Sequence, residues 1–236
     1  MSQYRALEKV RLEIAAQLGP TSQWKTPDGY ADGLALCVID AIWSLGVSYQ
    51  AHVVPVVTRY REYRAGEGGD ADTDGLIELL ATYAAVGGDD EFADRIGTRH
   101  RTSTHPGAPL KATAVRMAAE LLSAPPHRIG TMTMFHNANS VTRAAVKRAW
   151  RTLPGQRSSS IGWRYLLMLA GEDEVKADRM IRRFVARAVN TTNVSDEVAG
   201  QLVEAAAASL GVSARTLDYA IWSYESRAAR TRRSSR

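Results

Sequence analysis

The sequence predicts an all-α protein, and three observations support this fold class. Apolar residues recur every three or four positions along most of the 236-residue chain, which is the spacing of one helix face. Ala, Leu, Arg and Glu, which favour helices, dominate these segments. Glycine, proline or capping residues separate one segment from the next, and no segment reads convincingly as a strand.

Two predicted helices open the chain. Segment 3–18 has one apolar face and ends at Gly19-Pro20, a pair that stops a helix. Segment 33–45 follows a loop and is apolar on most of its sides, and Gly46 ends it. A helix that is apolar all round is normally buried, so we expect this one at the centre of the protein.

Nine more helices are predicted after these two. In segment 51–64, Pro55 is compatible with a helix only in the first turn, because proline lacks an amide hydrogen. Thr73 is expected to cap the following helix. The polar stretch 98–109 and the stretch around Phe135 are expected to be loops. The nine helices span residues 51–64, 73–86, 89–97, 110–122, 140–152, 158–170, 178–189, 195–210 and 213–227.

The composition narrows the class of protein. A content of 45% hydrophobic and 23% charged residues is typical of a globular protein. Cys37 is the only cysteine, which excludes an intramolecular disulfide and any all-cysteine metal or iron–sulfur site. No apolar run approaches the roughly 20 residues that span a bilayer, and the first residues lack a signal-peptide core. We therefore expect a cytoplasmic, nucleoid-associated monomer without a membrane partner or cofactor.

Charge is distributed unevenly along the chain. The net charge is +5, yet residues 62–96 hold ten acids and two arginines. Residues 139–190 reverse the balance, with eleven lysines and arginines against four acids, and the last ten residues hold five arginines and no acid. A solvated basic face would explain this pattern, but together with the turn described next it favours a nucleic-acid partner. The basic tail, 228–236, is expected to be disordered.

A Pro-Gly turn joins two predicted helices in this basic region. Pro154 fixes one backbone dihedral angle and Gly155 can adopt a positive φ, so the turn is tight and its amides can converge outward. Together with the N-terminus of the next helix, these amides form a site for a phosphate. The predicted DNA contacts are Leu153, Gly155, Gln156, Arg157, Ser158, Ser159 and Arg164.

The same region resembles a known family. Residues 140–190 are similar to the signature of the helix–hairpin–helix (HhH-GPD) DNA glycosylase superfamily, which is a Leu-Pro-Gly-Val-Gly hairpin followed by a Gly/Pro-rich stretch and an invariant aspartate. The matching residues are Leu153-Pro154-Gly155, Leu166-Leu167-Met168-Leu169-Ala170 and Val175-Lys176-Ala177-Asp178-Arg179. The resemblance implies two helical halves with a DNA-binding cleft between them. The implied domains are 33–171, ending in the helix–hairpin–helix, and 1–32 with 172–227.

The resemblance also implies a reaction and a catalytic residue. Asp178 would stabilise positive charge on the sugar, or activate water, as the N-glycosidic bond of a flipped nucleotide breaks. Asp178 could equally be an N-cap of the helix that follows, and both roles can hold together. Ser159 stands where bifunctional relatives place a lysine nucleophile, so we expect base removal without lyase activity. Arg157 replaces the second hairpin glycine, and the iron–sulfur cluster motif is absent.

Five residues are candidates for the base pocket or for the wedge that replaces a flipped base. Trp24 and Tyr30 could stack on a base, although such residues more often cover a core. Asp40 lies on the apolar central helix, where a carboxylate must either be paired or line the pocket. Tyr49 and Gln50 fall in the region that fills the gap left by the flipped base in relatives, but either could equally be an ordinary residue at the start of a helix.

Two alternatives to a monofunctional DNA glycosylase stay open. A non-catalytic helix–hairpin–helix DNA-binding protein would use the turn only to hold phosphate. An all-α regulator unrelated to DNA repair would make the Pro-Gly turn a coincidence. The sequence does not identify the base that would be excised.

Overall fold

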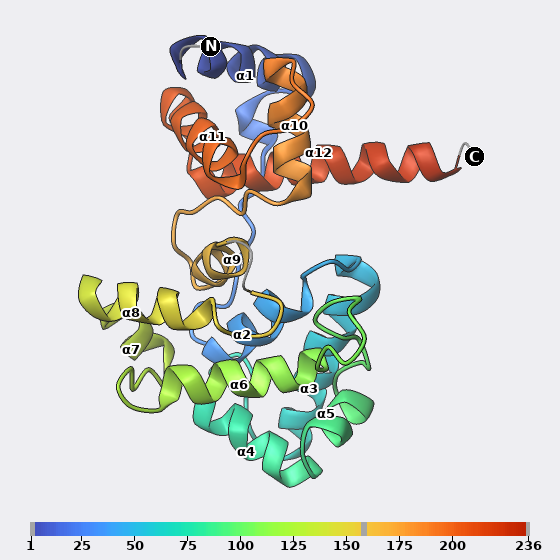
Figure 1. The fold of residues 1–236 in the computed structure, drawn as a ribbon, viewed down its shortest axis with the longest axis vertical. Helices are drawn as coiled ribbons and strands as arrows, with labels where there is room; N and C mark the ends of the chain where they lie inside the picture. The colour runs from blue at the N-terminus through green and yellow to red at the C-terminus, as the bar shows by residue number, and fades with distance from the viewer. Residues whose placement is uncertain (1–2, 157–159, 235–236) are drawn as a thin grey trace. The chain divides into compact units, whose positions relative to one another are not determined.

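The structure, a computed structural model, describes residues 3–156 and 160–234 (Figure 1). Over these residues the protein is built from helices, as predicted, and the only β-type pairing is one isolated bridge between Arg101 and Leu110. The chain forms two compact units. Unit 1 comprises Met1–Asp28 and Glu172–Arg236, and unit 2 comprises Gly29–Gly171. The sequence analysis placed its first domain boundary four residues later than the structure does and its second at the same position.

Unit 2 is organised around one buried helix. All ten residues of α2 are buried, as expected for a segment that is apolar on most sides, and α2 packs against α3, α4, α6 and α9. The elements of unit 2 are α2 (Leu34–Trp43), the π-helix η2 (Tyr49–Val53), α3 (Val54–Gly66), α4 (Leu76–Val86), α5 (Asp89–Arg95), α6 (Lys111–Ser123), α7 (Met132–Asn137), α8 (Ser140–Trp150) and α9 (Ile161–Leu169).

A buried lysine caps the C-terminal end of α2. Lys111 is 2% exposed, and its Nζ donates hydrogen bonds to the carbonyls of Trp43 at 2.7 Å and Leu45 at 2.6 Å. Carbonyls at a helix C-terminus lack partners within the helix and carry partial negative charge, so a cation is well placed there. This contact fixes α6 to the central helix.

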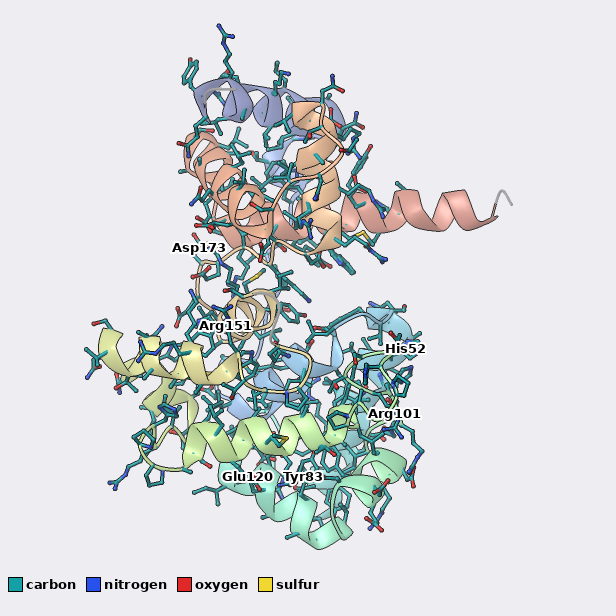
Figure 2. The ribbon with its side chains drawn as sticks, viewed as in Figure 1. His52, Tyr83, Arg101, Glu120, Arg151 and Asp173 are labelled. Carbon is teal, nitrogen blue, oxygen red and sulfur yellow. The ribbon has the colours of Figure 1, made fainter. Side chains whose placement is uncertain are left out.

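Aromatic packing joins α4, α5 and α6. Tyr83, labelled in Figure 2, stacks on Phe92 with ring centroids 3.9 Å apart. The Tyr83 hydroxyl donates to the carbonyl of Ala112 at 2.7 Å, so its polar end is satisfied inside the core.

Unit 1 is a cluster of four helices with its own core. Its α1 packs against α10 and α11, and α12 packs against both of these. Val10 and Ile14 of α1 meet Ile181 and Phe184 of α10 in that core. An ion pair of 2.7 Å between Glu13 and Arg187 also joins α1 to α10. The elements are α1 (Gln3–Gln17), the 3-10 helix η1 (Thr21–Gln23), α10 (Arg179–Val189), α11 (Asp196–Leu210) and α12 (Ala214–Ser234).

The structure differs from the sequence prediction at three places. The loop expected around Phe135 contains α7, which Thr131 caps by accepting a hydrogen bond from the amide of Met134. Thr73 is not a cap, because α4 begins at Leu76. The expected disordered tail is also corrected, since α12 continues through Ser234 beyond the other helices of its unit (Figure 1).

Other predicted boundaries agree with the structure to within a few residues. Pro55 lies in the first turn of α3, the only place where its missing amide hydrogen costs no helix bond. The amide of Gly75 donates to the Glu78 carboxylate at 3.0 Å and thereby supports the start of α4.

Candidate functional site

The turn between α8 and α9 depends on Gly155 and Gln156. Gly155 has φ +79°, and a Cβ there would lie 3.2 Å from the carbonyl oxygen of Thr102, so both conformation and space favour glycine. The Gln156 side chain turns inward, where its Oε1 accepts a hydrogen bond from Trp150 Nε1 at 3.1 Å. A Cβ on Gly162 would overlap that Oε1, so α9 needs a glycine opposite Gln156.

The predicted phosphate contacts divide into inward-facing and accessible residues. Leu153 is 2% exposed and Gln156 is 3% exposed, so their side chains belong to the core, and their amides donate to the carbonyls of Trp150 and Leu153, each at 3.1 Å. Gly155 is exposed and Arg164 is half-buried. The other three predicted contacts lie outside the described residues: Arg157, Ser158 and Ser159.

Asp178 is the N-cap of α10. Its Oδ1 accepts hydrogen bonds from the amides of Met180 at 2.7 Å and Ile181 at 3.4 Å, which positions the carboxylate at the helix N-terminus. The side chain is half-buried, and Oδ2 accepts no hydrogen bond from the residues that the structure describes. One oxygen of Asp178 therefore holds the helix while the other is left for a further contact.

A second carboxylate, Asp218, lies within electrostatic reach of Asp178 in unit 1. It is 6% exposed, and its Oδ1 has no hydrogen-bond partner in residues 3–156 and 160–234. Burial raises the pKa of Asp218 well above its ordinary value, and the charge of Asp178 raises it further, while Lys176 opposes both effects. Asp218 was not among the predicted site residues, although the sequence shows an acid between the apolar residues Leu217 and Ile221.

Three of the five pocket candidates come together around Asp40 in unit 2. Asp40 is fully buried on α2, and its Oδ2 accepts hydrogen bonds from the hydroxyls of Tyr30 at 2.9 Å and Tyr49 at 2.8 Å. Burial, followed by the Asp40 charge, raises the pKa of both tyrosines well above the ordinary value. Tyr165 on α9 has its pKa raised by the same two causes in the same order, and sequence reasoning missed this residue. Asp40 is therefore a paired carboxylate, one of the two alternatives that the sequence left open.

The remaining two candidates are not part of this cluster. Trp24 belongs to unit 1, where it packs on the core and donates from Nε1 to the carbonyl of Leu18 at 3.0 Å. Gln50 is exposed in η2. Trp24 thus covers the end of α1, as aromatic residues at a loop often do.

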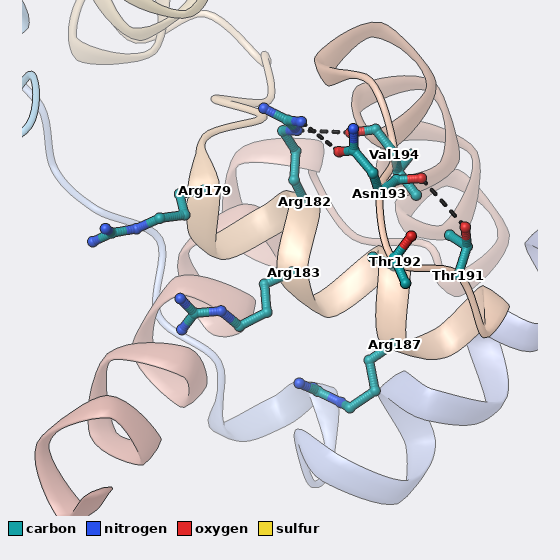
Figure 3. A pocket seen from close by; sticks show the side chains of 9 residues that line it. Arg179, Arg182, Arg183, Arg187, Thr191, Thr192, Asn193 and Val194 are labelled. Atoms are coloured by element: carbon teal, nitrogen blue, oxygen red, sulfur yellow. Dashed lines mark hydrogen bonds between the residues drawn. The ribbon is translucent and has the colours of Figure 1, made fainter. Parts of the chain in front are cut away.

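An arginine-lined hollow of about 440 Å³ lies along α10 in unit 1 (Figure 3). Its walls are one face of α10 and the loop that follows this helix. The lining residues are Arg179, Arg182, Arg183, Ala186, Arg187, Thr191, Thr192, Asn193 and Val194. The sequence analysis noted these arginines as part of the basic region but did not predict a concave site.

No group of three or more His, Cys, Asp or Glu side chains suited to a metal ion occurs in the described part of the chain. Among the described helices, none combines the length and the apolar character that crossing a membrane requires.

Comparison with known proteins gives one match. The model of a family described as a domain of unknown function, DUF8548, matches residues 8–226. The chain belongs to the DUF8548 family. Neither a curated protein nor a solved structure matches it. The DUF8548 match includes most of both units, together with the α8–α9 turn, Asp178 and the arginine-lined hollow.

Proposed function

We propose that this protein is a monofunctional DNA glycosylase that acts on double-stranded DNA containing a modified base. The proposal rests on the resemblance of residues 140–190 to the HhH-GPD superfamily. The observation that supports it most is at Asp178, because one carboxylate oxygen is fixed by two backbone amides while the other has no partner among the described residues. The tight turn between α8 and α9 is a second support, since the exposed Gly155 can offer its amide to a phosphate, while the amides of Leu153 and Gln156 donate inside the turn.

In the proposed reaction, DNA bends and the modified nucleotide leaves the base stack. The bond between the sugar C1′ and the base nitrogen breaks, and its electron pair leaves with the base. Asp178 Oδ2 stabilises the positive charge on the sugar and takes a proton from the attacking water, whose oxygen bonds to C1′. The base gains a proton, and an abasic site remains in the DNA.

The test is a base-release assay on duplexes that carry damaged, mismatched or hypermodified bases, with the released base identified by mass spectrometry. Asp178→Asn keeps an N-cap residue and removes the charge, so we expect a fall in release of about 10²–10⁴-fold with the fold intact. Asp173→Asn is the matched control, because the Asp173 carboxylate accepts the amide of Arg215 at 2.9 Å in the same unit.

The alternative function is a non-catalytic helix–hairpin–helix DNA-binding protein. It predicts salt-sensitive DNA binding with no base released from any duplex, and that result would overturn the glycosylase proposal. Equal release by the wild type and Asp178→Asn would remove Asp178 from the mechanism.

A further inference from the structure

The arginines of α10 form a stripe along one side of the helix. Arg179, Arg183 and Arg187 are spaced four residues apart, and their side chains extend to the same side of α10 in Figure 3. At a rise of 1.5 Å per residue, the stripe spans about 12 Å. Apolar residues of the opposite face, including Ile181 and Phe184, are buried in the core, so the stripe cannot rotate away from the surface.

The fourth arginine holds the opposite wall of the hollow in place. Arg182 donates from Nε to the carbonyl of Val194 and from a terminal nitrogen to Asn193 Oδ1, both at 2.7 Å. These bonds fix the loop after α10 without neutralising Arg182, because both acceptors are uncharged. The loop also presents the exposed hydroxyl of Thr192 beside the arginines.

The charges around the hollow do not cancel. Arg187 pairs with Glu13 and with Glu225, each at 2.7 Å, so its charge is compensated. Arg183 lies 3.7 Å from the other oxygen of Glu225. Arg179 is exposed and forms no ion pair or hydrogen bond with the residues that the structure describes.

The hollow therefore has four guanidinium groups, and the carboxylates of Glu13 and Glu225 pair only with those of Arg183 and Arg187. The nearest further acid in the sequence is Asp178, and counting its carboxylate as well leaves four formal positive charges against three negative ones. The hollow has an excess of positive charge, carried mainly by Arg179 and Arg182 on its two sides.

We propose that this hollow binds phosphate groups of a DNA strand, in a contact separate from the α8–α9 turn. The identification of the polyanion as DNA rests on the proposed function. The planar guanidinium fork binds phosphate oxygens in pairs, and arginine is favoured over lysine where such geometry matters. Arg179 and Arg183 are about 6 Å apart along the helix axis, close to the rise of two nucleotide steps on one strand. Arg179 also directly follows Asp178, so a bound phosphate would lie close to the proposed catalytic carboxylate.

The test uses the double variant Arg179→Gln with Arg183→Gln in the full chain. Both side chains reach the surface, and Arg183 lies 3.7 Å from Glu225 without a hydrogen bond to it, so the two changes break no hydrogen bond between described residues. Arg11→Gln is the matched control, because Arg11 is an exposed arginine of unit 1 that pairs with Glu8 on α1. Binding to a fluorescent duplex is measured over a series of salt concentrations, with the thermal unfolding of each variant as a check on the fold.

Losing two phosphate contacts should reduce the slope of log affinity against log salt by about 1.8, and affinity at 0.1 M salt by roughly 60-fold. The control should keep the wild-type slope. Unchanged DNA binding in the double variant, or an equal loss in Arg11→Gln, overturns the proposal.

A second measurement separates a DNA strand from a free anion. Inorganic phosphate is titrated while the backbone amide signals of Thr192 and Asn193 are followed by NMR. If phosphate shifts these signals but the double variant binds DNA normally, the hollow is a free-phosphate site and the DNA proposal is overturned. If the double variant loses DNA affinity as expected and the wild type releases no base, this proposal stands and the glycosylase proposal fails.

Discussion

Replacing Tyr49 by phenylalanine tests whether the hydroxyls around Asp40 stabilise unit 2. The change removes one hydroxyl and keeps the aromatic ring. The lost bond is 2.8 Å long and ends on a carboxylate with no exposed surface, where solvent cannot replace it. A hydrogen bond to a charged group contributes about 1.5–3 kcal/mol, so Tyr49→Phe should lower the free energy of unfolding by about 2 kcal/mol.

Urea unfolding at neutral pH, followed by circular dichroism, measures this loss. Tyr4→Phe is the control, because Tyr4 is 72% exposed and should change stability little. Tyr30→Phe should cost about as much as Tyr49→Phe, since its hydroxyl binds the same Oδ2 at 2.9 Å. The double variant should lose more than the sum, because it removes the hydroxyls of Tyr30 and Tyr49 from the same buried oxygen.

A loss below about 0.5 kcal/mol in both single variants, or strict additivity in the double variant, would refute this reasoning. Such a result would mean that another donor, such as the Tyr165 hydroxyl, satisfies Asp40 when one of these hydroxyls is removed.

Four further predictions follow from the structure. Asp178→Ala should lower the free energy of unfolding by about 1 kcal/mol while Asp178→Asn changes it less, as urea unfolding would measure, because asparagine can still cap α10. Gly162→Ala should cost about 1–3 kcal/mol despite the better helix propensity of alanine, since its Cβ overlaps Gln156 Oε1, and adding Gln156→Ala should recover part of the loss in the same assay. The raised pKa of Asp218 means that the folded state keeps a proton that the unfolded chain releases above pH 3.8. The contribution of Asp218 to stability therefore falls as the pH rises. Asp218→Asn should be more stable than the wild type at neutral pH, and urea unfolding should show that this difference shrinks in acid. The raised pKa values of the buried tyrosines have the same sign, so urea unfolding should show stability falling above pH 10, less steeply in Tyr49→Phe than in the wild type.

Helical periodicity predicted most of the fold because nearly every long helix buries one face. The central position of α2 followed from its continuous apolar run, and the stop at Gly19-Pro20 from the chemistry of those two residues. The short α7 has only six residues, too few for a repeating pattern of apolar residues to be recognised. The one feature of the sequence that indicates this helix is its capping residue, Thr131. The helical end of α12 was missed because a run of arginine and serine has the composition of a disordered tail.

The local roles of Asp178 and Asp40 could be predicted because they depend on the residues next to them in the sequence. Asp178 is an N-cap because aspartate favours that position whatever the tertiary structure, and Asp40 needed partners because it interrupts an apolar helix. The inward turn of Gln156 depends on Trp150 and on the space left by Gly162, which only the packed structure reveals. The concave shape of the α10 hollow likewise depends on the path of the loop beyond Asn190.

The two ends of unit 2 are fastened together, and this matters while the chain is being synthesised. The amide of Tyr30 donates to the carbonyl of Leu169 at 2.8 Å, so unit 2 begins and ends at neighbouring points. A ribosome that has just translated Gly171 has therefore supplied everything that unit 2 requires. By contrast, α1 is translated before unit 2, but its Val10 and Ile14 are covered only by α10 and α11, which follow unit 2. The apolar face of α1 therefore finds its partners only after the whole of unit 2 has been translated.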